Sequence, residues 1–330
     1  MSTQWTESQL AELNGQIASL REMLARVIVG QQDVVEQLLV ALLAGGHALI
    51  EGVPGLGKTL LVKTLSEAMT LDFRRIQFTP DLMPSDIIGT ELLEEEHGSG
   101  KRFFRFQKGP IFTQILLADE INRTPPKTQS ALLEAMQEKS VTFAGEQHAL
   151  PKPFFVLATQ NPIEQAGTYP LPEAQLDRFL LHIEVNYPGE EEELAIVSRT
   201  TAADGQGTTA VMSAETLLTL QKLTREMVVS ERLLLHATRL IRATRPQLSE
   251  LKIVREFVSW GAGPRAAQAL VLCAKARAVL QGRLAITRED IAAMLPSVLR
   301  HRVILGFQAE ADNVRLADVL TALQALPLPN

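Results

Sequence analysis

The segment 52–59, with the sequence GVPGLGKT, restricts the fold of this 330-residue chain more than any other. It follows the apolar run HALIE at 47–51 and precedes the helical pattern LLVKTLSEAM at 60–69. A strand, a G-x-x-x-x-G-K-T loop and a helix in this order are typical of proteins that bind nucleotide phosphates. The glycines let backbone N–H groups face the phosphates, Lys58 reaches the β- and γ-phosphates, and the Thr59 hydroxyl binds Mg²⁺.

A glycine-rich turn without a ligand is the alternative interpretation of this loop. Such a turn would require neither the Lys-Thr pair nor a strand and a helix on its two sides, so we favour a phosphate site. The residues that we expect to contact the nucleotide are Gly52, Pro54, Gly55, Leu56, Gly57, Lys58, Thr59 and Leu60.

Short apolar runs rich in β-forming residues recur between residues 47 and 184. They lie at 47–51, 73–77, 115–119, 154–158 and 180–184. Each is short enough for a buried strand, and the next is far enough along the chain for a helical crossover. The pattern therefore predicts an α/β core with a five-stranded parallel sheet.

Helical patterns dominate on both sides of this core. Residues 6–44 predict two helices with a break at Val29-Gly30, and further helices are expected at 190–203, 214–228, 231–245, 264–281 and 287–299. The strand signals stop after residue 188, so we predict a small α-helical domain there. The expected organisation is N-terminal helices at 1–45, an α/β core at 46–188 and the helical domain at 189–330.

Composition and charge limit the classes of partner. The 38 acidic and 32 basic residues give a net charge of −6 without any basic run, which argues against nucleic acid as a ligand. A single cysteine, Cys273, excludes an internal disulfide bond and a zinc site made of cysteine pairs. The sequence shows neither a signal-peptide pattern nor an apolar stretch of membrane-spanning length, so we expect a cytoplasmic protein that is not an integral membrane protein.

Two adjacent carboxylates, Asp119 and Glu120, follow the buried run ILLA at 115–118. In phosphoryl transfer, an acid in the position of Asp119 binds Mg²⁺ through its water shell. Its neighbour Glu120 can orient and deprotonate the water that attacks the γ-phosphate. By itself such a pair is more often a solvated strand end or a helix cap, but the loop at 52–59 favours the catalytic interpretation.

Several long segments together resemble the MoxR family of AAA+ ATPases, and the resemblance covers nearly all of the chain. They are GGHALIEGVPGLGKT, FRRIQFTPDLMPSDIIGT, ADEINRTPPKTQSALLEAMQE, ATQNPIEQAGTYPLPEAQLDRF and the shorter IVGQ and GPRA. The resemblance implies an AAA+ P-loop core followed by a helical lid, with ATP and Mg²⁺ bound. It also implies a homo-oligomeric ring, usually a hexamer, with each nucleotide between core and lid and each active site at a subunit boundary.

The resemblance assigns roles to residues for which spacing alone gives none. Asn161 resembles the sensor 1 residue, which holds the attacking water; the alternative is a turn-forming asparagine before Pro162. Arg178 resembles the arginine finger, which reaches the ATP of the neighbouring subunit. The alternative for Arg178 is a surface ion pair with Asp177 or Glu173.

Three further residues have two interpretations each. Arg265, in the segment GPRA, resembles the sensor 2 residue that couples the lid to the nucleotide; the alternative is a solvated arginine in the first turn of a helix. Val29 and Gly30 match the segment that packs around adenine; the alternative is a turn between two helices. Arg123, three residues after Glu120, is ambiguous, because it could stabilise phosphate or pair with a surface acid.

Two segments predict β-hairpin insertions. The first, at about 81–110, contains the turn sequence GSG between an acidic stretch and a basic, Phe-rich stretch; the second is at about 140–152. Both match hairpins of the resembling family that face the pore or one rim of the ring. Phe103, Phe104 and Phe106 alternate, so two of them share a face, and packing within the hairpin is the alternative to a contact surface.

The resemblance implies an ATPase that couples ATP hydrolysis in a ring to the remodelling, maturation or assembly of a separate protein partner. A partner that carries a von Willebrand factor A domain would fit, because this chain has no such domain. Two alternatives stay open: an AAA+ motor that acts on nucleic acid, and a scaffold gated by nucleotide binding without essential turnover. The negative charge argues against the first, and the intact set of Glu120, Asn161 and Arg178 argues against the second.

Overall fold

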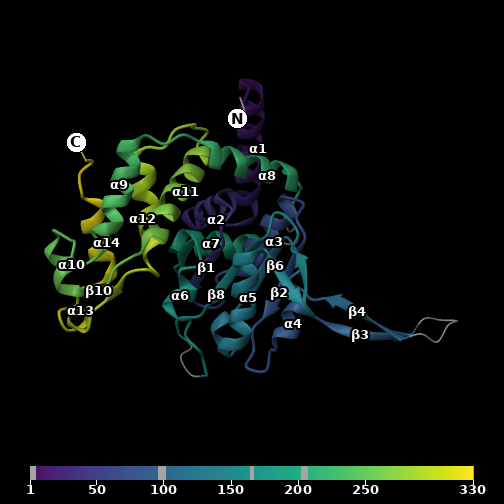
Figure 1. Ribbon diagram of the computed structural model, residues 1–330. Helices are drawn as coiled ribbons and strands as arrows, with labels where there is room; N and C mark the ends of the chain where they lie inside the picture. The colour runs from purple at the N-terminus through teal and green to yellow at the C-terminus, as the bar shows by residue number, and fades with distance from the viewer. Residues whose placement is uncertain (1–4, 96–101, 164–166, 202–206, 330) are drawn as a thin grey trace.

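The computed structural model describes residues 5–95, 102–163, 167–201 and 207–329. Its centre is a five-stranded parallel sheet in the order β2-β5-β8-β1-β9, which confirms the predicted α/β core (Figure 1). The strands are β1 (Ala48–Gly52), β2 (Phe73–Gln77), β5 (Ile115–Asp119), β8 (Phe155–Gln160) and β9 (Leu181–Val185). The connections between them contain α3 (Lys58–Ala68), α4 (Pro84–Ile88), the 3₁₀ turn η1 (Ile121–Arg123), α5 (Pro126–Glu138) and α6 (Glu173–Leu176).

Both faces of the sheet are covered, which explains why its central strands are apolar at almost every position. Along β5, Ile115 and Leu117 face one hydrophobic core, whereas Leu116 and Ala118 face the other. Helix α5 contributes to this second core, for example through Leu132. The first core extends well beyond the sheet, into helices from both ends of the chain.

The helices predicted outside the core are present and end within a few residues of the predicted positions. They are α1 (Glu7–Val27), α2 (Gln32–Ala44), α7 (Glu190–Thr200), α8 (Ala214–Glu226), α9 (Glu231–Arg242), α11 (Pro264–Leu280) and α12 (Arg288–Leu299). Helix α2 packs against α8, α11 and β9, and α1 packs against α3 and α11. The N-terminal helices therefore lie between the sheet and the helical lid, and one hydrophobic core runs through all of them.

The lid contains elements that the sequence did not predict. Strands β10 (Val258–Trp260) and β11 (Ile304–Leu305) form an antiparallel pair, which corrects the expectation that no strand follows residue 188. The other unpredicted elements are α10 (Lys252–Phe257), α13 (Phe307–Ala311) and α14 (Leu316–Gln324). Strands of two or three residues are too short to show a periodic pattern, and their pairing joins distant parts of the chain.

Both predicted hairpins are present. The first pairs β3 (Gly89–Glu95) with β4 (Arg102–Lys108) and projects away from the core (Figure 1); the second pairs β6 (Ser140–Phe143) with β7 (Glu146–Ala149). The predicted GSG turn and the side chain of Phe103 lie outside the described residues.

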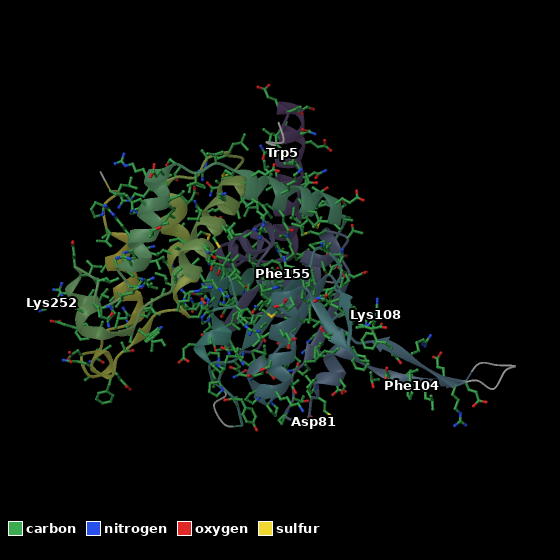
Figure 2. The ribbon with its side chains drawn as sticks, in the orientation of Figure 1. Trp5, Asp81, Phe104, Lys108, Phe155 and Lys252 are labelled. Carbon is green, nitrogen blue, oxygen red and sulfur yellow. The ribbon has the colours of Figure 1, made fainter. Side chains whose placement is uncertain are left out.

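Phe104 and Phe106 share one face of the first hairpin but have different surroundings. At the base of the hairpin, the Phe106 ring stacks on Phe143 and His148, with ring centroids 4.6 and 4.7 Å apart. Phe104 lies further out and is 68% exposed (Figure 2). Packing therefore explains why position 106 is a phenylalanine, since Phe106 joins the two hairpins. It does not explain the exposed Phe104.

Candidate active site

The phosphate loop joins β1 to α3 and is open on the side of its glycines. Gly55 and Gly57 have φ angles of 85° and 72°, a left-handed conformation that favours glycine. A Cβ atom added at either position would meet nothing within 4 Å. Gly57 is the N-cap of α3, and no side chain caps this end of the helix. The first N–H groups of α3 are therefore available to an anion bound in the loop.

Lys58, the first residue of α3, bends back over the phosphate loop. Its Nζ donates a hydrogen bond to the carbonyl oxygen of Gly52 at 2.6 Å. Burial lowers the pKa of its ammonium group, and the carboxylates of Asp119, Glu120 and Glu51 oppose this shift. The fold therefore brings the lysine and the predicted acid pair to the same edge of the sheet.

A pocket of about 490 Å³ lies against the phosphate loop. Its walls include Val29, the loop residues 54–57, Leu60, Tyr187 and two α7 residues, Ile196 and Val197. The Nε2 atom of Gln31 donates to the carbonyl oxygen of Leu56 at 3.1 Å, which ties the segment after α1 to the loop. Apolar walls beside open backbone N–H groups fit a nucleotide base next to its phosphates, and the α7 wall was not predicted.

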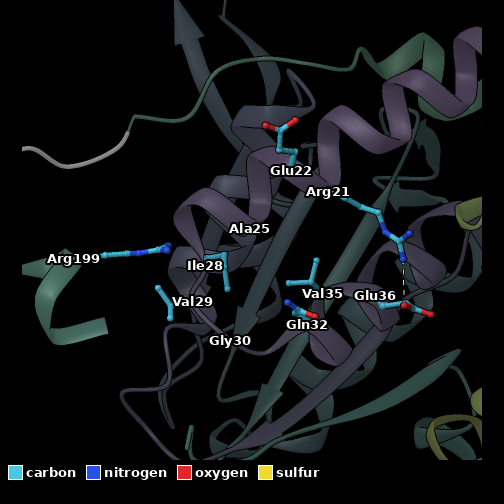
Figure 3. Close-up of a pocket in the computed structure, with 10 residues that line it drawn as sticks. All are labelled: Arg21, Glu22, Ala25, Ile28, Val29, Gly30, Gln32, Val35, Glu36 and Arg199. Carbon is cyan, nitrogen blue, oxygen red and sulfur yellow. Dashed lines mark hydrogen bonds and ion pairs between the residues drawn. The ribbon is translucent and has the colours of Figure 1, made fainter. Parts of the chain in front are cut away.

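Gly30 adopts a backbone conformation that favours glycine. Its φ is 66°, and an added Cβ atom would lie 2.5 Å from a carboxylate oxygen of Glu192 in α7. Gly30 lines a neighbouring pocket of about 520 Å³, in which Arg21 of α1 is ion-paired with Glu36 of α2 at 3.2 Å (Figure 3). Arg199 of α7 lies at the same pocket. Because the Glu192 contact is with the far end of a flexible side chain, the left-handed turn alone explains the glycine without a nucleotide.

Asp119 and Glu120 are held by groups from the two strands that flank β5. The hydroxyl of Thr159 in β8 donates to Asp119 Oδ1 at 2.6 Å and accepts the backbone N–H of Glu120 at 2.9 Å. From β2, Arg75 Nη2 donates to Asp119 Oδ2 at 2.7 Å. Glu120 has a left-handed φ of 57°, so the chain turns sharply where β5 ends.

The side chain of Glu120 has two further partners. Gln77 Nε2 donates to Glu120 Oε2 at 2.8 Å, and Arg123 Nε lies 3.1 Å from the same oxygen. Arg123 thus pairs with the predicted catalytic base itself. The sequence did not predict Gln77, Thr159 or Arg75. A signal was present for Gln77 and Thr159, which lie at the carboxyl ends of the strands next to β5, where side chains of parallel strands meet, but not for Arg75, which lies in the middle of β2.

Asn161 follows β8 directly and is buried. Its Oδ1 accepts the backbone N–H of Ile163 at 3.1 Å, so the turn-forming role that was the alternative interpretation is present. Because β8 lies between β5 and β1, Asn161 is also at the edge of the sheet that carries the phosphate loop and the acid pair. The turn holds the amide at this edge, as the sensor 1 interpretation requires.

Neither Arg178 nor Arg265 lines the pocket at the phosphate loop. Arg265 Nη1 is 3.4 Å from Asp177 Oδ2, and Arg302 Nε is 2.6 Å from Asp177 Oδ1. Arg178 lines a polar cavity of about 370 Å³ against α5, together with Glu134. Among the described residues no carboxylate forms an ion pair with Arg178, and its neighbour Asp177 binds Arg265 and Arg302 instead.

The two predicted magnesium ligands, Thr59 and Asp119, fit a metal ion that takes most of its ligands from a bound nucleotide and from water. Thr59 lies in the first turn of α3, and Asp119 ends β5. No group of three or more His, Cys, Asp or Glu residues in the described ranges could hold a metal ion on its own. Mg²⁺ at phosphate sites takes one or two protein ligands, phosphate oxygens and water, so a hydroxyl and a single carboxylate suit it.

Comparisons with known proteins agree with this fold. The description "ATPase family associated with various cellular activities" matches residues 47–181, and an AAA lid domain matches residues 250–323. The chaperone MoxR1 of Mycobacterium tuberculosis is 44% identical over 306 residues, covering 92% of this chain and 80% of that protein. Protein MoxR of Methylorubrum extorquens is 29% identical over 342 residues, covering 98% of both chains. A solved structure from Cytophaga hutchinsonii, described as a candidate ATPase, is 39% identical, with a TM-score of 0.90 and 98% of both chains covered.

The parallel sheet, the phosphate loop and the helical lid define a P-loop ATPase of the AAA+ class. Within that class, the chain belongs to the MoxR family. In the part of the chain that the structure describes, no helix is long and apolar enough to cross a membrane.

Proposed function

We propose that this protein hydrolyses ATP to ADP and phosphate. The observation that supports this most is the convergence of Lys58, Asp119, Glu120 and Asn161 at one edge of the sheet, beside the open loop. Glu120 takes a proton from water as the water oxygen attacks the γ-phosphorus, and the bond between that phosphorus and the bridging oxygen breaks. Lys58 binds the phosphates, and Asn161 orients the water. Thr59 and Asp119 would hold Mg²⁺, which neutralises phosphate charge when it is bound.

The second part of the proposal concerns assembly into a homo-oligomeric ring, hexameric as in the resembled family. Arg178 lies away from the phosphate loop of its own chain, so we assign it to the ATP of the neighbouring subunit. Arg265 is ion-paired with Asp177, and we assign it the sensor 2 role, in which it couples the position of the lid to the state of the nucleotide. Val29 and the α7 side chains hold the base of the subunit's own nucleotide.

The ring uses this hydrolysis to remodel, mature or assemble a separate protein partner in the cytoplasm, where ATP is supplied. The relative from Mycobacterium tuberculosis is named a chaperone, which supports this coupling. The protein partner could be one that carries a von Willebrand factor A domain. The net charge of −6 disfavours the alternative of a motor on nucleic acid.

Mixing two inactive variants tests the hydrolysis and the ring together. Lys58→Ala subunits lack a working phosphate loop but keep Arg178. Arg178→Ala subunits keep a working phosphate loop but lack the arginine. Each variant alone should be inactive. A random 1:1 mixture should recover about one quarter of the wild-type rate, because one interface in four combines a good loop with a good finger. If the subunits exchange and no activity returns, or if a strictly monomeric form hydrolyses ATP at the full rate, the assignment of Arg178 is wrong.

A further inference from the structure

Arg302, just after α12, is a buried arginine whose hydrogen bonds converge on the segment that carries Arg178. Its side chain is only 3% exposed. Its guanidinium donates to Asp177 Oδ1 at 2.6 Å and to the carbonyl oxygens of Asp177, Phe179 and Leu180 at 3.3, 2.6 and 3.2 Å. One further bond goes back into α12, to the carbonyl oxygen of Val298 at 2.6 Å.

The residue before it strengthens the same attachment. His301 is buried, and burial lowers the pKa of its imidazole well below the usual value, so the ring is neutral at pH 7. Its Nε2 lies 3.1 Å from the carbonyl oxygen of Phe179 and donates to it. The Phe179 side chain is fully buried. The end of the lid helix therefore holds the backbone on both sides of Arg178.

A buried arginine is costly to desolvate, so an arrangement of this kind persists only where its donors are satisfied. Here a planar guanidinium supplies N–H donors in fixed directions to one carboxylate and several carbonyl oxygens. A lysine ammonium group in the same place could reach only part of this set, because it has three donors on one nitrogen. The other carboxylate oxygen of Asp177 contacts Arg265.

We propose that Arg302 is a positioning residue for ATP hydrolysis in the neighbouring subunit. By attaching residues 177–180 to the end of α12, it makes the lid of one subunit determine where Arg178 lies in the next active site. This inference rests on the proposed function, because it requires a ring in which Arg178 acts between subunits.

The test uses Arg302→Lys, which keeps the buried charge but loses the directional donors. Binding of a fluorescent ATP analogue to its own phosphate loop should stay within about twofold of wild type, whereas turnover should fall about tenfold or more. Mixed with Lys58→Ala subunits, whose Arg178 is well placed, Arg302→Lys should recover activity. Mixed with Arg178→Ala subunits it should not, because both variants then lack a working finger.

Arg300→Lys is the matched control, because Arg300 lies two residues earlier and bonds to Glu184 and to the carbonyl oxygen of His182 instead. Alone it should hydrolyse ATP at about the wild-type rate, and its subunits should supply a working Arg178 to Arg178→Ala subunits in a mixture. Loss of ATP binding by Arg302→Lys, no recovery with Lys58→Ala, or recovery with Arg178→Ala would each overturn the role of Arg302. Failure of the reference pair, Lys58→Ala with Arg178→Ala, would instead overturn the ring on which it rests.

Discussion

Glu120 is the residue on which the proposed chemistry depends most, and its surroundings fix its orientation. Thr159 holds its backbone N–H, while Gln77 and Arg123 hold one oxygen of its carboxylate. Thr159 also bonds to Asp119, so the predicted base and the predicted magnesium ligand share one anchor. The acid pair is therefore positioned by polar groups of the adjacent strands and of the turn η1.

Glu120→Gln should bind ATP normally and lose turnover by about 10²- to 10⁴-fold, because the amide keeps the size of the side chain but cannot accept the proton. Lys58→Ala should instead weaken ATP binding, since it removes the cation that faces the phosphates. Nucleotide binding and phosphate release, measured on both variants, separate the two effects. Glu215→Gln, on the exposed surface of α8, is the matched control and should behave like wild type. Turnover by Glu120→Gln at the wild-type rate would remove Glu120 from the mechanism.

At the scale of elements, the two hairpins are joined through Phe106. Phe106→Ala should lower the free energy of unfolding by about 1–3 kcal/mol, because it removes the stacking on Phe143 and His148. Phe104→Ala should change it by less than about 0.5 kcal/mol, since that ring is 68% exposed. Urea unfolding of both variants measures the difference. Equal effects would mean that Phe106 does not join the hairpins.

His47, just before β1, links three elements of the core. Its Nδ1 accepts the backbone N–H of Val156 in β8 at 3.0 Å, and its Nε2 donates to the carbonyl oxygen of Met136 in α5 at 3.1 Å. Burial lowers its pKa from 6.5 to about 4. Between these pH values the imidazole of His47 is protonated in the unfolded chain and neutral in the folded chain.

The free energy of unfolding should therefore be highest above pH 6.5 and fall as the pH is lowered toward 4, by about 3 kcal/mol from His47 alone. Urea titrations at several pH values, compared with His47→Gln, isolate this contribution from other buried histidines. The variant should lose less stability over the same range. Parallel curves for the two proteins would contradict the lowered pKa of His47.

At the scale of the whole molecule, the sheet, the N-terminal helices and the lid share one hydrophobic core, with α2 packed between β9 and α11. The domain limits at residues 45 and 188 are still predictions, and this continuous core crosses both of them. The lid and the sheet are therefore packed through a continuous set of apolar side chains. The segment between α1 and α2 lines the pocket at the phosphate loop through Val29.

The charge of the whole chain carries a further prediction. Because the net charge is −6, DNA and RNA should not stimulate ATP hydrolysis at about 150 mM salt, whereas a protein partner should. Steady-state ATPase assays with duplex DNA, single-stranded RNA and a candidate partner test this. Stimulation by DNA that persists at this salt concentration would favour a nucleic-acid motor.

The sequence by itself determined the α/β core, the phosphate loop, the acid pair, the hairpins and most lid helices. These features are local: a strand or a glycine loop shows in consecutive residues, because backbone geometry fixes its period and its turn chemistry. Only the tertiary structure decided that Gln77, Arg75 and Thr159 hold the acids, and that Arg302 holds the segment of Arg178. Such contacts join residues far apart in the chain and depend on strand order and helix packing, which a single sequence does not encode in any local pattern.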